Sequence, residues 1–127
     1  MDFFPFTNGV LHAEGITLER IAAEVGTPAY VYSAGALRAA FQAWTSAFAG
    51  VPHRICYSVK ANSNLAVLGL FRSLGSAFDV VSGGELARVL RAGGQAKDVV
   101  FAGVGKTDAE IAQALDAEIL MFNVESE

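Results

Sequence analysis

The sequence has one cysteine and two histidines among its 127 residues. Cys56 therefore cannot form an internal disulfide, and no Cys-x-x-Cys pair is present for zinc or redox chemistry. Basic residues are also few, because 9 Lys+Arg stand against 13 Asp+Glu and the formal net charge is −4. Nucleic-acid-binding modules usually carry a basic surface. The composition thus argues against a metal site, a disulfide framework and a nucleic-acid partner.

Long apolar runs are missing as well. No stretch approaches the roughly 18–20 residues that cross a bilayer, and the opening MDFFPFTNG has neither the basic flank nor the apolar centre of a secretion signal. We therefore expect a cytoplasmic protein that has no membrane partner. The sequence does contain 53% hydrophobic residues and 13 glycines. This combination is typical of buried parallel strands joined by tight turns.

Before Pro52 the patterns predict a short helix, a strand and a long helix. Apolar positions recur at helical spacing from Thr17 until Gly26. The run PAYVYS, residues 28–33, is rich in the aromatic and β-branched residues that strands favour. Ser33 then offers an N-cap to a helix over residues 34–49. The apolar stripe of that helix consists of Leu37, Ala40, Phe41, Trp44 and Phe48.

After Pro52 short apolar runs alternate with helical patterns. The predicted strands start near Ile55, Ala77, Val99 and Ile119. Strand starts about 20 residues apart leave room for one crossover helix each, so we expect an α/β fold with about four parallel βα units. The crossovers should be right-handed. Because an open last strand is normally covered or closed, we interpret the sequence as the front portion of a longer protein.

The strongest local signal is YSVKAN, residues 57–62, which places Lys60 at the carboxyl end of an apolar strand. In parallel α/β folds this edge carries the ligand site. A lysine that is desolvated there has a lowered pKa and can attack an aldehyde, so one hypothesis is a Schiff-base lysine. The alternative is an ordinary lysine whose amine reaches water.

The next strand, in FDVVSGGEL, contains Asp79. A carboxylate in an apolar strand needs a partner, and Lys60 is a plausible one. Ser82 and Glu85 have the spacing of a capping box, which is a more ordinary role for Glu85 than catalysis. The glycines at 83–84 could admit an anion at the helix N-terminus, although two glycines are a weak phosphate signal.

The stretch FAGVGKTDAEI resembles two nucleotide-binding motifs and matches neither. A P-loop needs glycine where Val100 stands, and a dinucleotide fingerprint needs a small residue where Asp108 stands. Thr107 and Glu110 instead predict a second capping box. Lys106 is then expected to be a solvated loop residue or a minor contact at the mouth of the site.

Three remaining residues are interpreted as structural. His53 is expected in a surface turn, and His12 lies in an N-terminal arm without a recognisable pattern. Cys56 alternates with Tyr57 in a strand and is expected to act as a small apolar filler.

Together, YSVKANSNLAVL, FDVVSGGEL, VVFAGVGKTDAEI and FNVESE resemble the N-terminal third of bacterial diaminopimelate decarboxylases, from about residue 27 to residue 127. That resemblance implies a (β/α)8 TIM barrel that binds pyridoxal 5'-phosphate and is followed by a β domain. Residues 34–127 would form the first half of the barrel. Residues 1–33 would form an arm that packs with the C-terminal β domain, and the remainder of the barrel and that β domain would lie outside the sequence.

By the same resemblance, Lys60 binds the cofactor through a Schiff base and Asp79 lies near the cofactor. The activity implied is decarboxylation of meso-2,6-diaminopimelate to L-lysine by a homodimeric parent enzyme that takes this small-molecule amino acid as substrate. We expect the 127-residue piece alone to be inactive. Two alternatives stay open: another pyridoxal-dependent basic amino acid decarboxylase or racemase, and a non-catalytic α/β half-barrel that binds a partner through its sheet edge.

Overall fold

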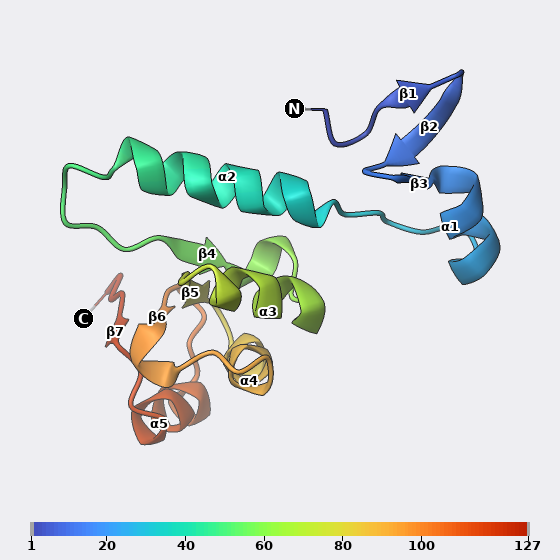
Figure 1. Ribbon diagram of the computed structural model, residues 1–127. Coiled ribbons are helices and arrows are strands. Elements are labelled where there is room, and N and C mark those ends of the chain that lie inside the picture. The colour runs from blue at the N-terminus through green and yellow to red at the C-terminus, as the bar shows by residue number, and fades with distance from the viewer. Residues whose placement is uncertain (1, 127) are drawn as a thin grey trace. The chain divides into compact units, whose positions relative to one another are not determined.

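The computed structural model describes residues 2–126 and divides into two compact units, Met1–Ser46 and Ala47–Glu127 (Figure 1). The first unit begins with a three-stranded antiparallel sheet of order β1-β2-β3. Its strands are β1 (Phe6–Thr7), β2 (Val10–Ala13) and β3 (Ile16–Thr17). These strands lie in the N-terminal arm, which we expected to have no recognisable pattern, and that expectation is wrong.

A local signal for this sheet is present in the turn between β1 and β2. Asn8 and Gly9 both have positive φ, 52° and 80°. An Asn-Gly pair with this geometry joins two antiparallel strands, because its twist matches theirs. The pair therefore predicts a hairpin even though the flanking strands are too short to show an alternating pattern.

The short helix is confirmed as α1 (Leu18–Val25). Thr17 Oγ1 accepts a hydrogen bond from the Arg20 N–H, and the helix ends at Gly26, whose φ is 81°. The long helix is confirmed as α2 (Ala34–Ala47), which ends two residues earlier than expected. Ser33 caps it as predicted, since its Oγ accepts a hydrogen bond from the Ala36 N–H at 2.9 Å.

The strand expected over residues 28–33 is wrong. This segment contains no strand, and Tyr30 and Tyr32 have 93% and 54% of their surface exposed. Aromatic and β-branched residues favour strands because they pack against a neighbouring strand. Within residues 2–126 no such neighbour pairs with this segment, so the preference of the residues is not realised.

The second unit confirms the parallel sheet, whose order is β4-β5-β6-β7. Its strands are β4 (Cys56–Ser58), β5 (Ala77–Val80), β6 (Val99–Phe101) and β7 (Met121–Phe122). Between them lie α3 (Leu65–Ser73), α4 (Gly83–Arg91) and α5 (Asp108–Asp116), with short 3-10 turns η1 (Val59–Ala61) and η2 (Ala96–Asp98). The three helices follow one another along one side of the sheet (Figure 1).

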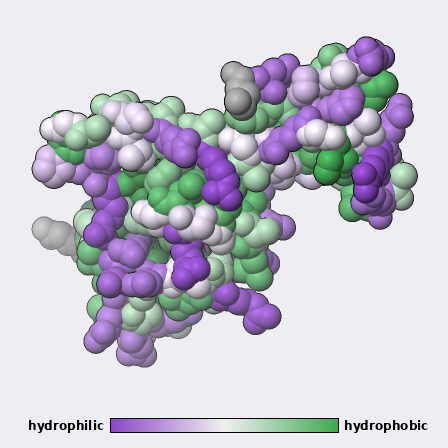
Figure 2. Space-filling view, viewed as in Figure 1, coloured by the Kyte–Doolittle hydropathy of each residue, from purple (hydrophilic) through white to green (hydrophobic). Residues whose placement is uncertain are grey.

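The core of the second unit fills the space between the strands and these helices. Its largest fully buried side chains are Val59, Leu68, Phe78, Val80, Leu86, Val89, Val99 and Phe101. Burial of each such side chain stabilises the fold by about 1.5–3 kcal/mol relative to exposure. On the face shown in Figure 2, hydrophilic side chains cover most of the region of α4 and α5, with hydrophobic ones between them. The helices thus cover one face of the sheet. The loops that follow the strands lie where the parallel strands end, and we call this end of the sheet its carboxyl edge.

Candidate active site at the carboxyl edge of the sheet

Lys60 lies in η1, directly after β4, and thus at the carboxyl edge as the sequence predicted. The turn that carries it is fixed by its neighbours. Val59 is fully buried, and the Tyr57 hydroxyl donates a hydrogen bond to the Asn62 carbonyl oxygen at 3.1 Å. The Tyr57 ring stacks on Phe71 of α3, with 4.0 Å between ring centroids. The backbone of Lys60 is therefore held from the strand and from the following helix.

The Lys60 side chain itself is exposed. Within residues 2–126 Val59 is buried and the next side chain turns toward solvent, which is the alternative of a lysine whose amine reaches water. None of the ion pairs within this range includes Lys60. An unpaired ammonium is costly to bury, so an exposed side chain is the stable arrangement for an amine that is not bound to anything. It also leaves the amine accessible to an incoming carbonyl compound.

Asp79 is half-buried in β5, and its hydrogen-bond partner is Ser58 rather than Lys60. The Ser58 hydroxyl donates to Asp79 Oδ2 at 3.1 Å. Ser58 and Asp79 are opposite each other in the parallel register of β4 and β5, which puts both side chains on one face of the sheet. The proposed Lys60–Asp79 ion pair is absent from the described residues. Ser58 was missed because its role depends on the register of strands one βα unit apart.

The first predicted capping box is half right. Ser82 caps α4, since its Oγ accepts a hydrogen bond from the Glu85 N–H at 3.2 Å. Glu85, however, accepts the Val81 N–H at 2.8 Å instead of the Ser82 N–H. The carboxylate thereby holds the end of β5 to the first turn of α4, which agrees with a structural role for Glu85.

The second capping box, formed by Thr107 and Glu110 at the start of α5, is confirmed. Glu110 does more than was predicted, because its Oε1 also accepts the Gly83 N–H at 2.9 Å. The hydrogen bond from Gly83, followed by those from Thr107, lowers the pKa of the Glu110 carboxyl. The Glu110 carboxylate therefore accepts the Gly83 N–H, the same donor that an anion bound at the N-terminus of α4 would have needed. The glycine pair is accordingly not an open phosphate site.

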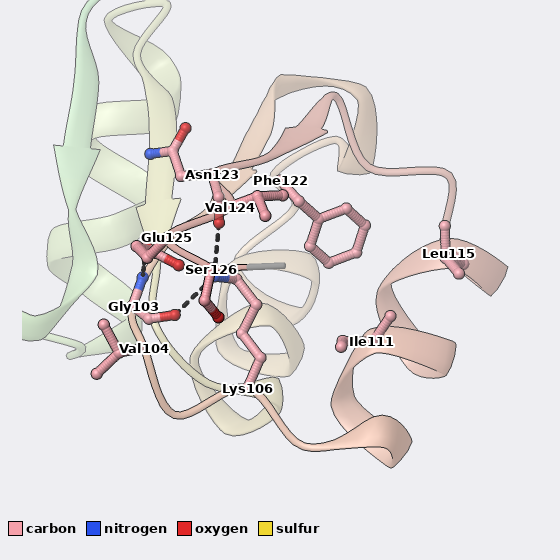
Figure 3. A pocket seen from close by; sticks show the side chains of 10 residues that line it. All are labelled: Gly103, Val104, Lys106, Ile111, Leu115, Phe122, Asn123, Val124, Glu125 and Ser126. Carbon is pink, nitrogen blue, oxygen red and sulfur yellow. Dashed lines mark hydrogen bonds and ion pairs between the residues drawn. The ribbon is translucent and has the colours of Figure 1, made fainter.

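Of the two alternatives expected for Lys106, the solvated loop residue is wrong, and the minor contact at the mouth of the site stays a prediction. The Lys106 side chain is only 11% exposed, and its Nζ donates to the Gly103 and Asn123 carbonyl oxygens at 2.6 and 2.7 Å and to Glu125 Oε2 at 3.0 Å. Figure 3 shows this cluster on one side of a cavity of about 380 Å³. The apolar side of the cavity is formed by Ile111, Leu115 and Phe122.

The remaining candidates have structural environments. His53 is exposed, with its Nδ1 2.8 Å from the Val51 carbonyl oxygen, and His12 lies in β2. Cys56 is half-buried in β4, and burial raises the pKa of its thiol, as suits an unreactive filler. Residues 2–126 hold no group of three or more side chains placed to bind a metal ion. None of the helices in this range has the length and apolar character that a bilayer crossing requires.

Comparison with known families identifies the domain that contains this edge of the sheet. Residues 34–127 match the family model described as "Pyridoxal-dependent decarboxylase, pyridoxal binding domain". The chain belongs to this family. In pyridoxal-dependent decarboxylases the cofactor is pyridoxal phosphate, and the parallel βα units seen here are the N-terminal portion of a TIM barrel. The fold class and the cofactor inferred from the sequence are thereby confirmed.

Relatives among pyridoxal-dependent decarboxylases confirm the resemblance to one branch. The chain is 52% identical over 126 residues to the diaminopimelate decarboxylase of Pseudomonas aeruginosa, covering 99% of this chain and 30% of the relative. It is also 52% identical over 128 residues to that of Vibrio cholerae, covering 100% and 31%. The chain thus spans about a third of the length of these curated relatives.

Solved structures have the same fold as this chain. AQ1208 from Aquifex aeolicus matches 98% of this chain and 31% of its own at a TM-score of 0.92 and 45% identity. The diaminopimelate decarboxylase of M. jannaschii in complex with L-lysine matches 98% of this chain and 30% of its own at a TM-score of 0.92 and 34% identity.

The residues at the carboxyl edge fit a pyridoxal-dependent decarboxylase. An aldehyde cofactor needs an accessible amine on a fixed backbone, and Lys60 provides both features. A half-buried carboxylate stands in the neighbouring strand, at Asp79, with one oxygen held by Ser58. The other lysine at this edge, Lys106, has its amine engaged by protein oxygens.

Proposed function

We propose that this chain is the N-terminal, cofactor-binding part of a diaminopimelate decarboxylase, which converts meso-2,6-diaminopimelate to L-lysine and carbon dioxide. The observation that carries the proposal is the fixed turn with its accessible amine at Lys60, in a sequence that is about half identical to diaminopimelate decarboxylases along its whole length. A small-molecule amino acid as ligand agrees with the lysine complex of the M. jannaschii enzyme.

Lys60 Nζ would hold the cofactor covalently by condensing with its aldehyde and releasing water. Bound pyridoxal phosphate supplies an electron-withdrawing ring that accepts the electron pair left behind when a carboxylate departs as carbon dioxide. Asp79 would face the bound group with a carboxylate whose Oδ2 is fixed by the Ser58 hydroxyl. Its Oδ1 has no partner among the described residues and is therefore available to a cationic group.

Several properties of the whole protein belong to the same proposal. Residues 1–33 would act as an arm that packs with a C-terminal β domain, and residues 34–127 as the first half of the barrel. The enzyme would be a cytoplasmic homodimer. Light scattering on the purified protein tests the dimer, which a monomer at micromolar concentration would contradict.

The deciding experiment measures carbon dioxide and L-lysine released from meso-diaminopimelate by the full-length protein with pyridoxal phosphate. Lys60→Ala should abolish product, because no other accessible lysine lies at this edge of the described sheet. Lys97→Ala is the matched control: this exposed lysine lies in η2, before β6, at the opposite edge. The 127-residue piece alone should release none.

The rival functions give different results in the same experiment. Product from ornithine or arginine but not from diaminopimelate would indicate another basic amino acid decarboxylase, and inversion without carbon dioxide a racemase. Reduction with borohydride in the presence of pyridoxal phosphate separates the third possibility. Equal labelling of Lys60, Lys97 and Lys106, with no product from any substrate, would indicate a non-catalytic binding module.

A further inference from the structure

Two lysines lie at the carboxyl edge of the same sheet, Lys60 after β4 and Lys106 in the loop after β6. Their environments are opposite. Lys60 is exposed, whereas the Lys106 side chain is 11% exposed and its amine lies among three oxygen atoms (Figure 3). A cofactor that carries an aldehyde and enters at this edge therefore meets two primary amines, of which only one can be productive.

The hydrogen bonds of Lys106 decide its chemical state. Its Nζ donates to the Gly103 carbonyl, the Asn123 carbonyl and Glu125 Oε2, at 2.6, 2.7 and 3.0 Å. A lysine has three N–H donors only as an ammonium group, and an ammonium group has no lone pair. As long as all three hydrogen bonds are present, the Lys106 amine cannot attack a carbonyl carbon.

Glu125 completes the cluster from the segment after β7. Its Oε1 accepts the Gly103 N–H at 3.1 Å, and its Oε2 accepts from Lys106. The hydrogen bond from Lys106 lowers the pKa of the Glu125 carboxyl, so the carboxylate is charged at neutral pH. One side chain thus binds both the backbone and the lysine of the loop after β6. The loop cannot move away from the end of β7 without breaking these charge-assisted contacts.

We propose that Glu125 is a positioning residue that keeps Lys106 bound to the loop and strand oxygens, so that Lys60 is the amine that reacts with the cofactor aldehyde. This inference rests on the proposed function. Glu125 acts through Lys106 and is not expected to touch the substrate. Its loss should open a second, unproductive attachment point for the aldehyde at the same edge of the sheet.

The test is competitive labelling of the purified protein with limiting pyridoxal phosphate and cyanoborohydride. Each reactive amine condenses with the aldehyde and releases water, and hydride from the reductant converts the carbon–nitrogen double bond to a stable amine that peptide mass spectrometry locates. Lys97 is the internal reference for an exposed lysine. In the unmodified protein Lys106 should react about tenfold more slowly than Lys97, because its amine must first leave three hydrogen bonds.

Glu125→Ala and Glu125→Gln should raise Lys106 labelling relative to Lys97 by about fivefold or more, since each removes the charged acceptor. Asp116→Asn, at the exposed end of α5, is the matched control and should leave the ratio unchanged. Lys106 labelling as fast as that of Lys97 in the unmodified protein would overturn the inference. So would Glu125 variants that leave Lys106 labelling unchanged.

The result for Lys60 is read separately. If Lys60 is not labelled in preference to Lys97, the proposed function fails, whatever Lys106 does. If Lys60 is preferred but Lys106 reacts freely, the function stands and the role of Glu125 is refuted. The ratio measured in the unmodified protein decides the matter even where a Glu125 variant does not fold.

Discussion

Tyr57→Phe is the sharpest probe of the turn that carries Lys60. The substitution keeps the ring that stacks on Phe71 at 4.0 Å and removes only the hydroxyl that donates to the Asn62 carbonyl at 3.1 Å. A hydrogen bond of this kind contributes about 1 kcal/mol to the free energy of unfolding. With a urea dependence of about 2 kcal/mol per molar, the midpoint of unfolding should fall by about 0.5 M.

Tyr57→Leu should lower the stability further, because it also removes the ring stack, which is worth about 0.5–1.5 kcal/mol. Tyr30→Phe is the matched control: its side chain is 93% exposed, and the midpoint should not change. Urea unfolding followed by far-ultraviolet circular dichroism measures all three variants. In the same proteins, reductive labelling of Lys60 should slow in Tyr57→Phe and stay constant in Tyr30→Phe.

Two outcomes would refute this reasoning. If Tyr57→Phe unfolds at the same urea concentration as the unmodified protein, the hydroxyl does not stabilise the turn. If the stability falls but Lys60 labelling is unchanged, the turn is held by Val59 and the stack alone, and Tyr57 is not a positioning residue for the amine.

Three further predictions concern stability and reactivity. Gly69→Ala in α3 should stabilise the protein by about 0.5–1 kcal/mol, because an added Cβ meets nothing within 4 Å. Gly94→Ala should destabilise it by about 1–3 kcal/mol, because its Cβ would lie 2.5 Å from Val89 Cγ1. Urea midpoints equal to that of the unmodified protein would contradict both. Hydrogen bonds, the strongest from the Ser33 hydroxyl, lower the pKa of the Glu14 carboxyl from 4.5, so its stabilising contribution is complete above that pH and is lost as the pH falls below it. Unfolding between pH 2 and 6 should therefore depend less on pH in Glu14→Gln, and identical acid profiles would count against the contact. Burial raises the pKa of the Cys56 thiol from 9.0, so iodoacetamide should modify it more slowly at pH 8.5 than it modifies free cysteine; an equal rate would show an accessible thiolate.

The parallel sheet could be predicted because its information is local. Strands that are buried on both faces appear as short apolar runs, and the helices between them begin at capping residues such as Ser82 and Thr107. Each predicted strand start lies within two residues of the observed one. Lys60 was likewise placed at the correct edge, because the carboxyl end of a strand follows from chain direction alone.

The side-chain contacts between elements far apart in the sequence could not be predicted in this way. Ser58 and Asp79 are 21 residues apart, Gly83 and Glu110 are 27 apart, and these pairs form only after strand register and helix position are set. Patterns within one element carry no information about such contacts. For the same reason Lys106 was expected to be a solvated loop residue or a minor contact at the mouth of the site, whereas oxygens from Asn123 and Glu125 accept hydrogen bonds from its amine.

In the second unit, paired residues of neighbouring strands are always the same number of residues apart in the sequence. Cys56 pairs with Ala77, Phe78 with Val99 and Val100 with Met121, a separation of 21 residues each time. The entropy lost in closing a loop rises with its length, so every addition to this sheet carries the same modest penalty. We therefore expect the sheet to grow during synthesis by one βα unit at a time, each new strand pairing with the strand made just before it.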